Sequence, residues 1–167
     1  MAENFDPLNI MQALQRELRT YIQQGHGPFL AAIYDAQGTL IAKAANSVVR
    51  DQCSHAHAEM NAIKLAQQKL KTYDLSPYNL SLVVTSEPCL MCLGGIMWSG
   101  LRALYYGVPS AQVEAITGFD EGFKPGWEEA FAKRGIKVVG NLAVPAGEEV
   151  LKEYVAQGHQ IYRPQRN

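Results

Sequence analysis

The sequence predicts an α/β fold, and three observations favour this class. Segments with helical spacing alternate with short apolar runs along the 167 residues. The run at 80–85 (LSLVVT) is continuously apolar, which is typical of a strand in a sheet that is covered on both faces. Two further apolar runs flank a turn-like DAQG at 35–38, which indicates an antiparallel hairpin.

Helices are expected where apolar residues recur every three or four positions. Asp6 and Pro7 read as an N-cap and a first helical residue, so the first helix should begin there and end near Gly25. The other helices are expected at 58–71, 89–98, 109–116, 128–134 and 148–157.

Strands are expected at 29–34, 40–44, 80–85, 102–108 and 136–139. The stretch 46–55 (NSVVRDQCSH) has no clear period and predicts a loop, and the tail at 159–167 carries no periodic signal. No repeat, low-complexity tract or linker divides the chain, so one domain is expected over residues 1–167.

The composition narrows the possible partners and location. Fifteen Lys and Arg against 16 Asp and Glu give a net charge of −1, so no basic field would hold a nucleic-acid backbone. Three cysteines do not suit a disulfide framework. The chain has no long apolar run, and its start (MAENFDP) lacks the features of a signal peptide. We therefore expect a soluble cytoplasmic protein with no membrane partner.

Two short motifs carry the chemistry, His57 and Glu59 in HAHAEMNAI and Cys89 and Cys92 in SEPCLMCLGG. One imidazole and two thiolates are three zinc ligands, and a catalytic zinc site leaves the fourth position open for water. A bound zinc ion lowers the pKa of that water toward ~7, which would supply hydroxide for a hydrolysis. The combination of HxE with PCxxC predicts a zinc nucleobase deaminase that holds one Zn²⁺ per chain.

Two other interpretations of the cysteine motif remain open. A CxxC can be a redox pair, although such motifs do not require a partner HxE. A structural zinc site would need a fourth protein ligand, which Cys53 or His55 could supply.

Glu59 is predicted to move protons rather than to bind the metal. Residues two apart on a helix point in diverging directions, so His57 can bind zinc while Glu59 reaches over the water. The alternative is that Glu59 only complements the dipole at the start of its helix.

At these motifs the chain resembles the cytidine-deaminase-like superfamily of zinc hydrolases, over about two thirds of its length. The resemblance implies a three-layer α/β/α fold around a five-stranded mixed sheet, hydrolytic loss of ammonia from a nucleobase, and a homodimer or higher oligomer. It also implies that His57, Cys89 and Cys92 bind zinc and that Glu59 is the proton shuttle.

Within this superfamily the chain is most similar to bacterial guanine deaminases, through GPF at 27–29, PCLMCLGGIMW at 88–98 and GFDEGF at 118–123. This resemblance implies that Asn46 binds the purine, that Phe29 and Trp98 line the pocket, and that an acid in the FDE segment, Glu121 or alternatively Asp120, protonates the leaving amine. It further implies guanine as the substrate, xanthine as the product, and a lid formed by residues 158–167 around Tyr162.

Each of these pocket residues also has a plainer interpretation. Asn46 could be a turn residue, Phe29 and Trp98 could be core residues, and Glu121 could be a solvated loop acid.

Rival functions also remain. A tRNA adenosine deaminase shares HAE and PCxxC, although GFDEGF and the near-neutral charge disfavour it. Cytosine, nucleoside or aminotriazine substrates are further alternatives. A binding module with an inert structural zinc is the alternative without catalysis.

Overall fold

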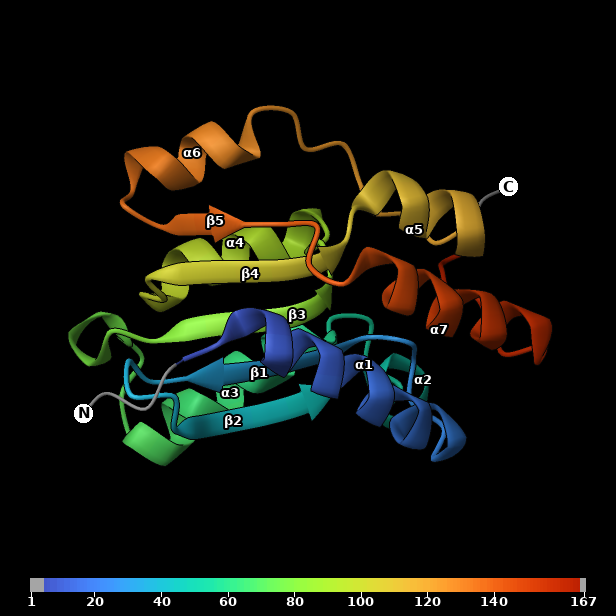
Figure 1. Ribbon diagram of the computed structural model, residues 1–167, viewed down its shortest axis with the longest axis horizontal. Coiled ribbons are helices and arrows are strands. Elements are labelled where there is room, and N and C mark those ends of the chain that lie inside the picture. Colours follow the sequence, from blue (N-terminus) through green and yellow to red (C-terminus); the bar gives the residue numbers. More distant parts are fainter. Residues whose placement is uncertain (1–4, 166–167) are drawn as a thin grey trace.

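A computed structural model of the protein describes residues 5–165 and has a five-stranded sheet at its centre (Figure 1). The strand order is β2-β1-β3-β4-β5. The strands span Leu30–Tyr34 (β1), Leu40–Ala45 (β2), Ser81–Ser86 (β3), Ala103–Val108 (β4) and Lys137–Val139 (β5).

The sheet is mixed, as the hairpin and the helix-covered strand predict. β1 pairs antiparallel with β2 and β3, while β3, β4 and β5 run parallel. In the hairpin turn, Asp35 Oδ1 accepts hydrogen bonds from the backbone N–H groups of Gln37 (2.9 Å) and Thr39 (2.8 Å). A short polar side chain therefore closes the turn, as Asx turns do.

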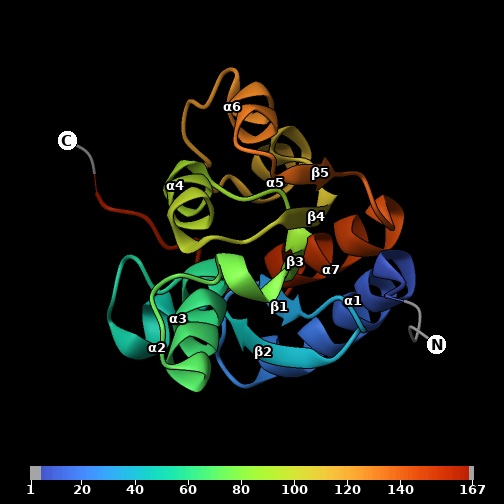
Figure 2. The ribbon, with the colours of Figure 1, turned by 90° about the vertical axis from the view of Figure 1, so that its left-hand side faces the viewer.

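Helices cover both faces of the sheet and confirm the three-layer α/β/α class (Figure 2). One face carries α3 (Ala58–Leu70), α4 (Leu90–Ser99) and α6 (Trp127–Lys133). The other carries α1 (Pro7–Gln23) and α7 (Val144–Ala156), and α5 (Ser110–Thr117) contacts α7.

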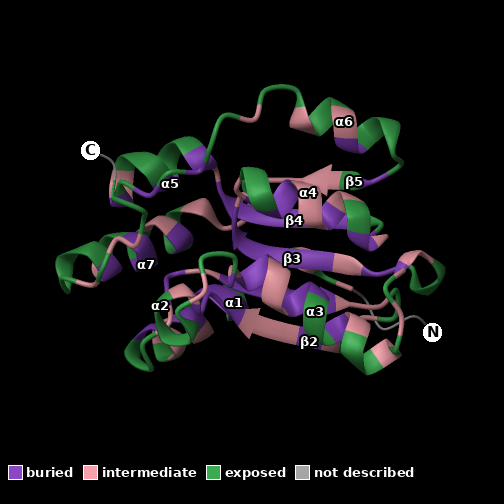
Figure 3. Cartoon of the chain, turned by 180° about the vertical axis from the view of Figure 1, so that it is seen from behind, coloured by how far each residue is buried: buried purple, intermediate pink, exposed green. Residues whose placement is uncertain are grey.

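Two apolar clusters hold these layers together, one on each side of the sheet. The strands between them, β3 and β4, are buried along most of their length (Figure 3). Leu82 and Val84 of β3 face the cluster below α3 and α4, whereas Val83 faces the cluster below α1. Successive side chains of a strand point to opposite faces, so a strand buried on both sides must be apolar throughout. The continuous run in β3 meets this requirement.

Two expectations from the sequence are wrong in detail. Residues 46–55 contain a one-turn helix, α2 (Val48–Asp51), in addition to loop, and the Ser47 hydroxyl donates to Asp51 Oδ2 (2.6 Å) across it. Helix α7 begins at Val144, four residues before the predicted start, because Pro145 occupies its first turn, where a missing N–H costs nothing.

A short 3₁₀ turn, η1 (Ser76–Tyr78), precedes β3. Within residues 5–165, none of the helices is long and apolar enough to cross a membrane.

Candidate active site

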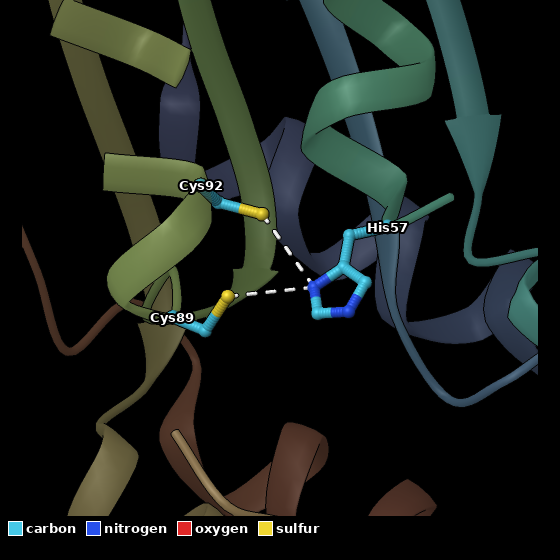
Figure 4. Close-up of side chains that lie close together, drawn as sticks. All are labelled: His57, Cys89 and Cys92. Carbon is cyan, nitrogen blue, oxygen red and sulfur yellow. Dashed lines mark hydrogen bonds between the residues drawn. The ribbon is translucent and has the colours of Figure 1, made fainter. Parts of the chain in front are cut away.

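The two sequence motifs meet at the carboxyl end of β3. His57 is the N-cap residue of α3 and Cys89 is the N-cap residue of α4, so both helices begin at the same place. Figure 4 shows one ring nitrogen of the His57 imidazole facing the sulfurs of both Cys89 and Cys92. In open α/β sheets this end of the strands is where ligands bind.

The spacing of these three side chains fits a zinc ion. His57 Nδ1 lies 3.4 Å from Cys89 Sγ and 3.6 Å from Cys92 Sγ. With Zn–S near 2.3 Å and Zn–N near 2.0–2.1 Å, neighbouring ligands of a tetrahedral ion are about 3.6 Å apart. All three ligand atoms lie within 4.8 Å of one another, so they are positioned to hold one metal ion.

In the described part of the chain, this metal-holding cluster does not include Cys53 or His55. The Cys53 sulfur instead lies 3.4 Å from the Nε2 atom of His55. This arrangement does not support the closed, four-ligand site that a structural zinc would need.

Cys89 is prepared to act as a thiolate. A hydrogen bond from the Cys92 thiol, together with the adjacent His57 imidazole, lowers the pKa of Cys89 to about 4. The start of α4 adds the positive end of a helix dipole. Thiolate is the form that binds zinc, so the local field favours the ligand state.

Two buried carboxyl groups lie beside the cluster. Glu59 Oε2 lies 3.3 Å from Cys92 Sγ, and burial raises the pKa of Glu59. Burial, together with the charges of Cys89 and Glu59, also raises the pKa of Glu121 to about 8. Neither acid is a solvated surface group.

A cavity of about 1300 Å³ opens above the cluster. Its lining includes His57, Glu59, Cys89 and Glu121, together with Phe29 and Asn46 from the first half of the chain. Asp120 lies at the same cavity.

Asn46 serves both as a turn residue and as part of this cavity. Its Oδ1 atom accepts a hydrogen bond from the Val48 backbone N–H (3.1 Å), which leaves the Nδ2 donors for another partner. The His26 ring nitrogen Nδ1 and the Gly27 N–H both contact the Asn46 carbonyl oxygen, at 2.9 and 3.2 Å. The backbone of Asn46 is therefore held from one side while its amide faces the cavity.

The tail contributes residues 160–165 to the lining of the cavity in its own chain. The Tyr162 ring packs on Phe119 with 4.6 Å between centroids, and Arg163 donates to the Gly118 carbonyl oxygen (3.2 Å). The Tyr162 hydroxyl is buried and has no hydrogen-bond partner within residues 5–165. A side chain at Gly27 would collide with both this hydroxyl and the Asn46 amide. Residues 160–165 thus line the cavity, the lid over 158–167 stays a prediction, and residues 166–167 lie outside the described part of the chain.

Sequence reasoning missed Phe119 as a wall of the cavity. Its ring meets Phe29 edge to face at 5.4 Å and Tyr162 on another side. An aromatic residue inside a glycine-rich loop, directly before two acids, was the available signal.

Trp98 lies elsewhere. It is on α4, is 74% exposed, and is not among the residues that line the cavity of this chain. The Arg134 guanidinium lies 5.9 Å from the centre of its ring. The single chain brings the other predicted site residues together without Trp98.

Comparison with known proteins shows that this chain is similar to zinc-binding deaminases. Residues 6–108 match the family model described as the cytidine and deoxycytidylate deaminase zinc-binding region. A solved guanine deaminase from Nitrosomonas europaea superimposes with a TM-score of 0.87 at 42% identity, over 90% of this chain and 85% of that one.

Two curated relatives are similar over shorter regions. The guanine deaminase of Bacillus subtilis is 38% identical over 97 residues, which are 58% of this chain and 60% of the relative. A tRNA-specific adenosine deaminase of Buchnera aphidicola is 38% identical over 78 residues, 47% of this chain and 50% of the relative. The chain thus aligns with only half to three fifths of these two proteins.

Proposed function

The chain belongs to the cytidine and deoxycytidylate deaminase zinc-binding family, and on this premise we propose that it converts guanine and water to xanthine and ammonia. The observation that carries the proposal is the open three-ligand cluster with buried Glu59 beside it and an aromatic cavity above it. The similarity to guanine deaminases supports the choice of base.

His57, Cys89 and Cys92 would hold the zinc ion, which would supply Lewis acidity and a water molecule of lowered pKa. Their distances and the thiolate character of Cys89 support this donor set.

Glu59 and Glu121 would divide the proton transfers. Glu59 accepts a proton from the attacking water and delivers it to the purine ring nitrogen, as the C–O bond forms at C2. Glu121, whose raised pKa keeps it protonated near neutral pH, then donates to the amino group while the C2–N bond breaks, and it regains a proton from the C2 hydroxyl as the carbonyl group forms. A carboxyl group with a pKa close to the working pH can both give and take protons.

The cavity would recognise the base by its edge and its faces. Guanine presents O6 and N7 as neighbouring acceptors. The Asn46 Nδ2 group and the Tyr162 hydroxyl can both donate to such an edge. The rings of Phe29, Phe119 and Tyr162 supply an apolar enclosure for a flat purine.

Trp98 is assigned to a contact between two copies of the chain. Exposed apolar side chains gather on α4 and on the loop beside it, and we call these residues the α4 patch: Leu90, Met91, Trp98 and Phe123. Contiguous exposed apolar surface marks an interaction site. The patch starts one residue after Cys89, so a partner seated there would lie next to the metal centre.

The direct test is turnover by the purified zinc-loaded protein. With guanine, xanthine and ammonia should be produced in equal amounts, and Glu59→Gln should retain zinc while losing turnover by at least about a hundredfold. Adenosine, cytosine, cytidine and a tRNA anticodon stem are tested beside guanine. Brisk turnover of one of these with none of guanine would overturn the substrate assignment, and full activity of Glu59→Gln would overturn the role of Glu59.

A further inference from the structure

A single lysine ties the loop that carries Glu121 to the metal motif. We propose that Lys124 is a positioning residue, whose ammonium group fixes the 118–126 loop against the turn that carries Cys89 and so holds the Glu121 carboxyl at the reacting centre. The inference rests on the proposed function, because it assigns Lys124 to the same site.

The ammonium group of Lys124 uses all its hydrogen atoms on two neighbouring segments. It donates to the Pro88 carbonyl oxygen (2.5 Å) and to the Ser110 hydroxyl oxygen (2.6 Å), and it forms an ion pair with the Glu87 carboxylate. A lysine has three N–H donors, so none remains for solvent. Glu87 and Pro88 directly precede Cys89, and Ser110 begins α5.

This ion pair is buried, unlike an ordinary surface pair. The side chains of Lys124 and Glu87 are 9% and 12% exposed, whereas those of Lys133 and Glu129 are each 73% exposed. Removing two charges from water is unfavourable, and only good geometry and further hydrogen bonds offset this cost. A lysine in this setting acts through a fixed position, because its stem cannot move without leaving its partners unpaired.

The loop is held at Glu121 as well. The Leu90 N–H donates to the Glu121 carbonyl oxygen (3.0 Å), and the Glu121 N–H donates to Glu114 Oε1 (3.1 Å). Lys124 lies three residues farther on and is not part of the cavity lining. It therefore acts through Glu121 and does not touch the base.

The variant Lys124→Met removes the charge and keeps the length of the side chain. We expect it to hold zinc like the wild type, with kcat for guanine at least about tenfold lower and KM changed by less than about threefold, because a small displacement of a catalytic group lowers the rate more than the affinity. Lys124→Arg should recover part of kcat. Lys133→Met, in the exposed pair, is the matched control and should keep wild-type kcat.

The single variant leaves Glu87 unpaired, so a second variant separates this effect from the loss of positioning. Glu87→Gln combined with Lys124→Met leaves no orphan charge and should unfold at nearly the wild-type temperature. Because Glu87 itself lines the cavity, the double variant is compared with Glu87→Gln alone, and its kcat should be the lower of the two, since the bonds to Pro88 and Ser110 are still missing. Recovery of kcat in the double variant to the value of Glu87→Gln would overturn the inference.

Amide hydrogen exchange provides a readout that does not depend on guanine. In Lys124→Met, exchange should become faster at Leu90 and across residues 118–126 and remain unchanged in β1. If the wild type does not act on guanine but exchange still becomes faster in Lys124→Met, guanine is not the substrate, and the role of Lys124 in fixing the loop is supported. If the wild type is active on guanine, and Lys124→Met keeps both its kcat and its slow exchange, Lys124 does not position the loop, whereas the proposed function is supported.

Discussion

At the scale of single residues, the Tyr162 hydroxyl should contribute to substrate binding but not to the stability of the fold. It is buried without a hydrogen-bond partner in the described structure, so Tyr162→Phe should not lower the unfolding temperature. If the hydroxyl donates to the base, the same change should raise KM for guanine about tenfold, which corresponds to one hydrogen bond of about 1.4 kcal/mol. Thermal unfolding and steady-state kinetics measure the two effects.

Tyr154→Phe is the control for that prediction. The Tyr154 hydroxyl donates to the Gln160 carbonyl oxygen (2.5 Å), so its loss should destabilise the fold by about 1 kcal/mol. Equal destabilisation by both changes would contradict the assignment of a substrate contact to Tyr162.

The cysteines predict a second contrast. Cys89→Ser should lose most of its zinc, because a neutral hydroxyl replaces a thiolate in a three-ligand site. Cys53→Ser should retain about one zinc per chain, since Cys53 lies outside the cluster. Metal analysis after gel filtration decides the matter. Zinc lost from both variants, or from Cys53→Ser alone, would argue for a different ligand set.

At this scale the sequence is informative where ligands are close along the chain. The spacing of Cys89 and Cys92 and the HxE motif predict the cluster because one helix start positions each pair. The contacts of Phe119 with Phe29 and Tyr162 join segments that are far apart in the sequence. No local sequence pattern encodes such long-range contacts. For the same reason the contacts of Lys124 with Glu87, Pro88 and Ser110 could not be predicted from the sequence.

At the scale of elements, one buried side chain of α1 joins its helical layer to the sheet. Gln15 of α1 donates from Nε2 to the Thr85 carbonyl oxygen at the end of β3 (3.1 Å). Gly107 of β4 and Gly147 of α7 leave the space that this amide occupies. The absence of two side chains thus lets a polar group cross the core and remain hydrogen-bonded.

Gly107→Ala should therefore be destabilising by about 1–3 kcal/mol, since its Cβ would overlap the Thr85 carbonyl oxygen in the neighbouring strand, where neither backbone can yield. Gly94→Ala is the control, because a Cβ there meets nothing within 4 Å and α4 gains helix propensity. Urea unfolding of both variants tests this. A Gly107→Ala protein as stable as the wild type would mean that the strands can separate at low cost.

Element boundaries show where local patterns succeed. All five strands lie within two residues of their predicted positions, because apolar runs end at turn residues. The one-turn helix α2 had no detectable period, since four residues are too few to show one. The segment before α2 is held from a distance along the chain: the Asn61 amide of α3 donates to the Ala45 carbonyl oxygen (3.1 Å) and to the Ser47 hydroxyl (2.9 Å).

At the scale of the whole molecule, charge and apolar surface point to different partners. A net charge of −1 gives no general attraction to a nucleic-acid backbone. The α4 patch, in contrast, exposes large apolar side chains, with Phe123 86% and Trp98 74% accessible. Gly122, beside Phe123, approaches the Leu90 side chain so closely that a Cβ there would meet it, so the loop lies against the start of α4. The partner that we propose for this surface is a second copy of the chain.

The whole-molecule prediction concerns this pairing. The wild type should have twice the 18.4 kDa mass of the chain in light scattering, and Trp98→Asp should shift it to a single chain, because a carboxylate in an apolar interface is costly to desolvate. Leu8→Asp is the matched control: Leu8 is exposed on α1, on the opposite face of the sheet, so that variant should keep the wild-type mass. A monomeric wild type at tens of micromolar, or an unchanged mass for Trp98→Asp, would remove the α4 patch as the site of pairing. If Trp98 instead contacts the base in the partner's cavity, Trp98→Phe should keep the wild-type mass and raise KM.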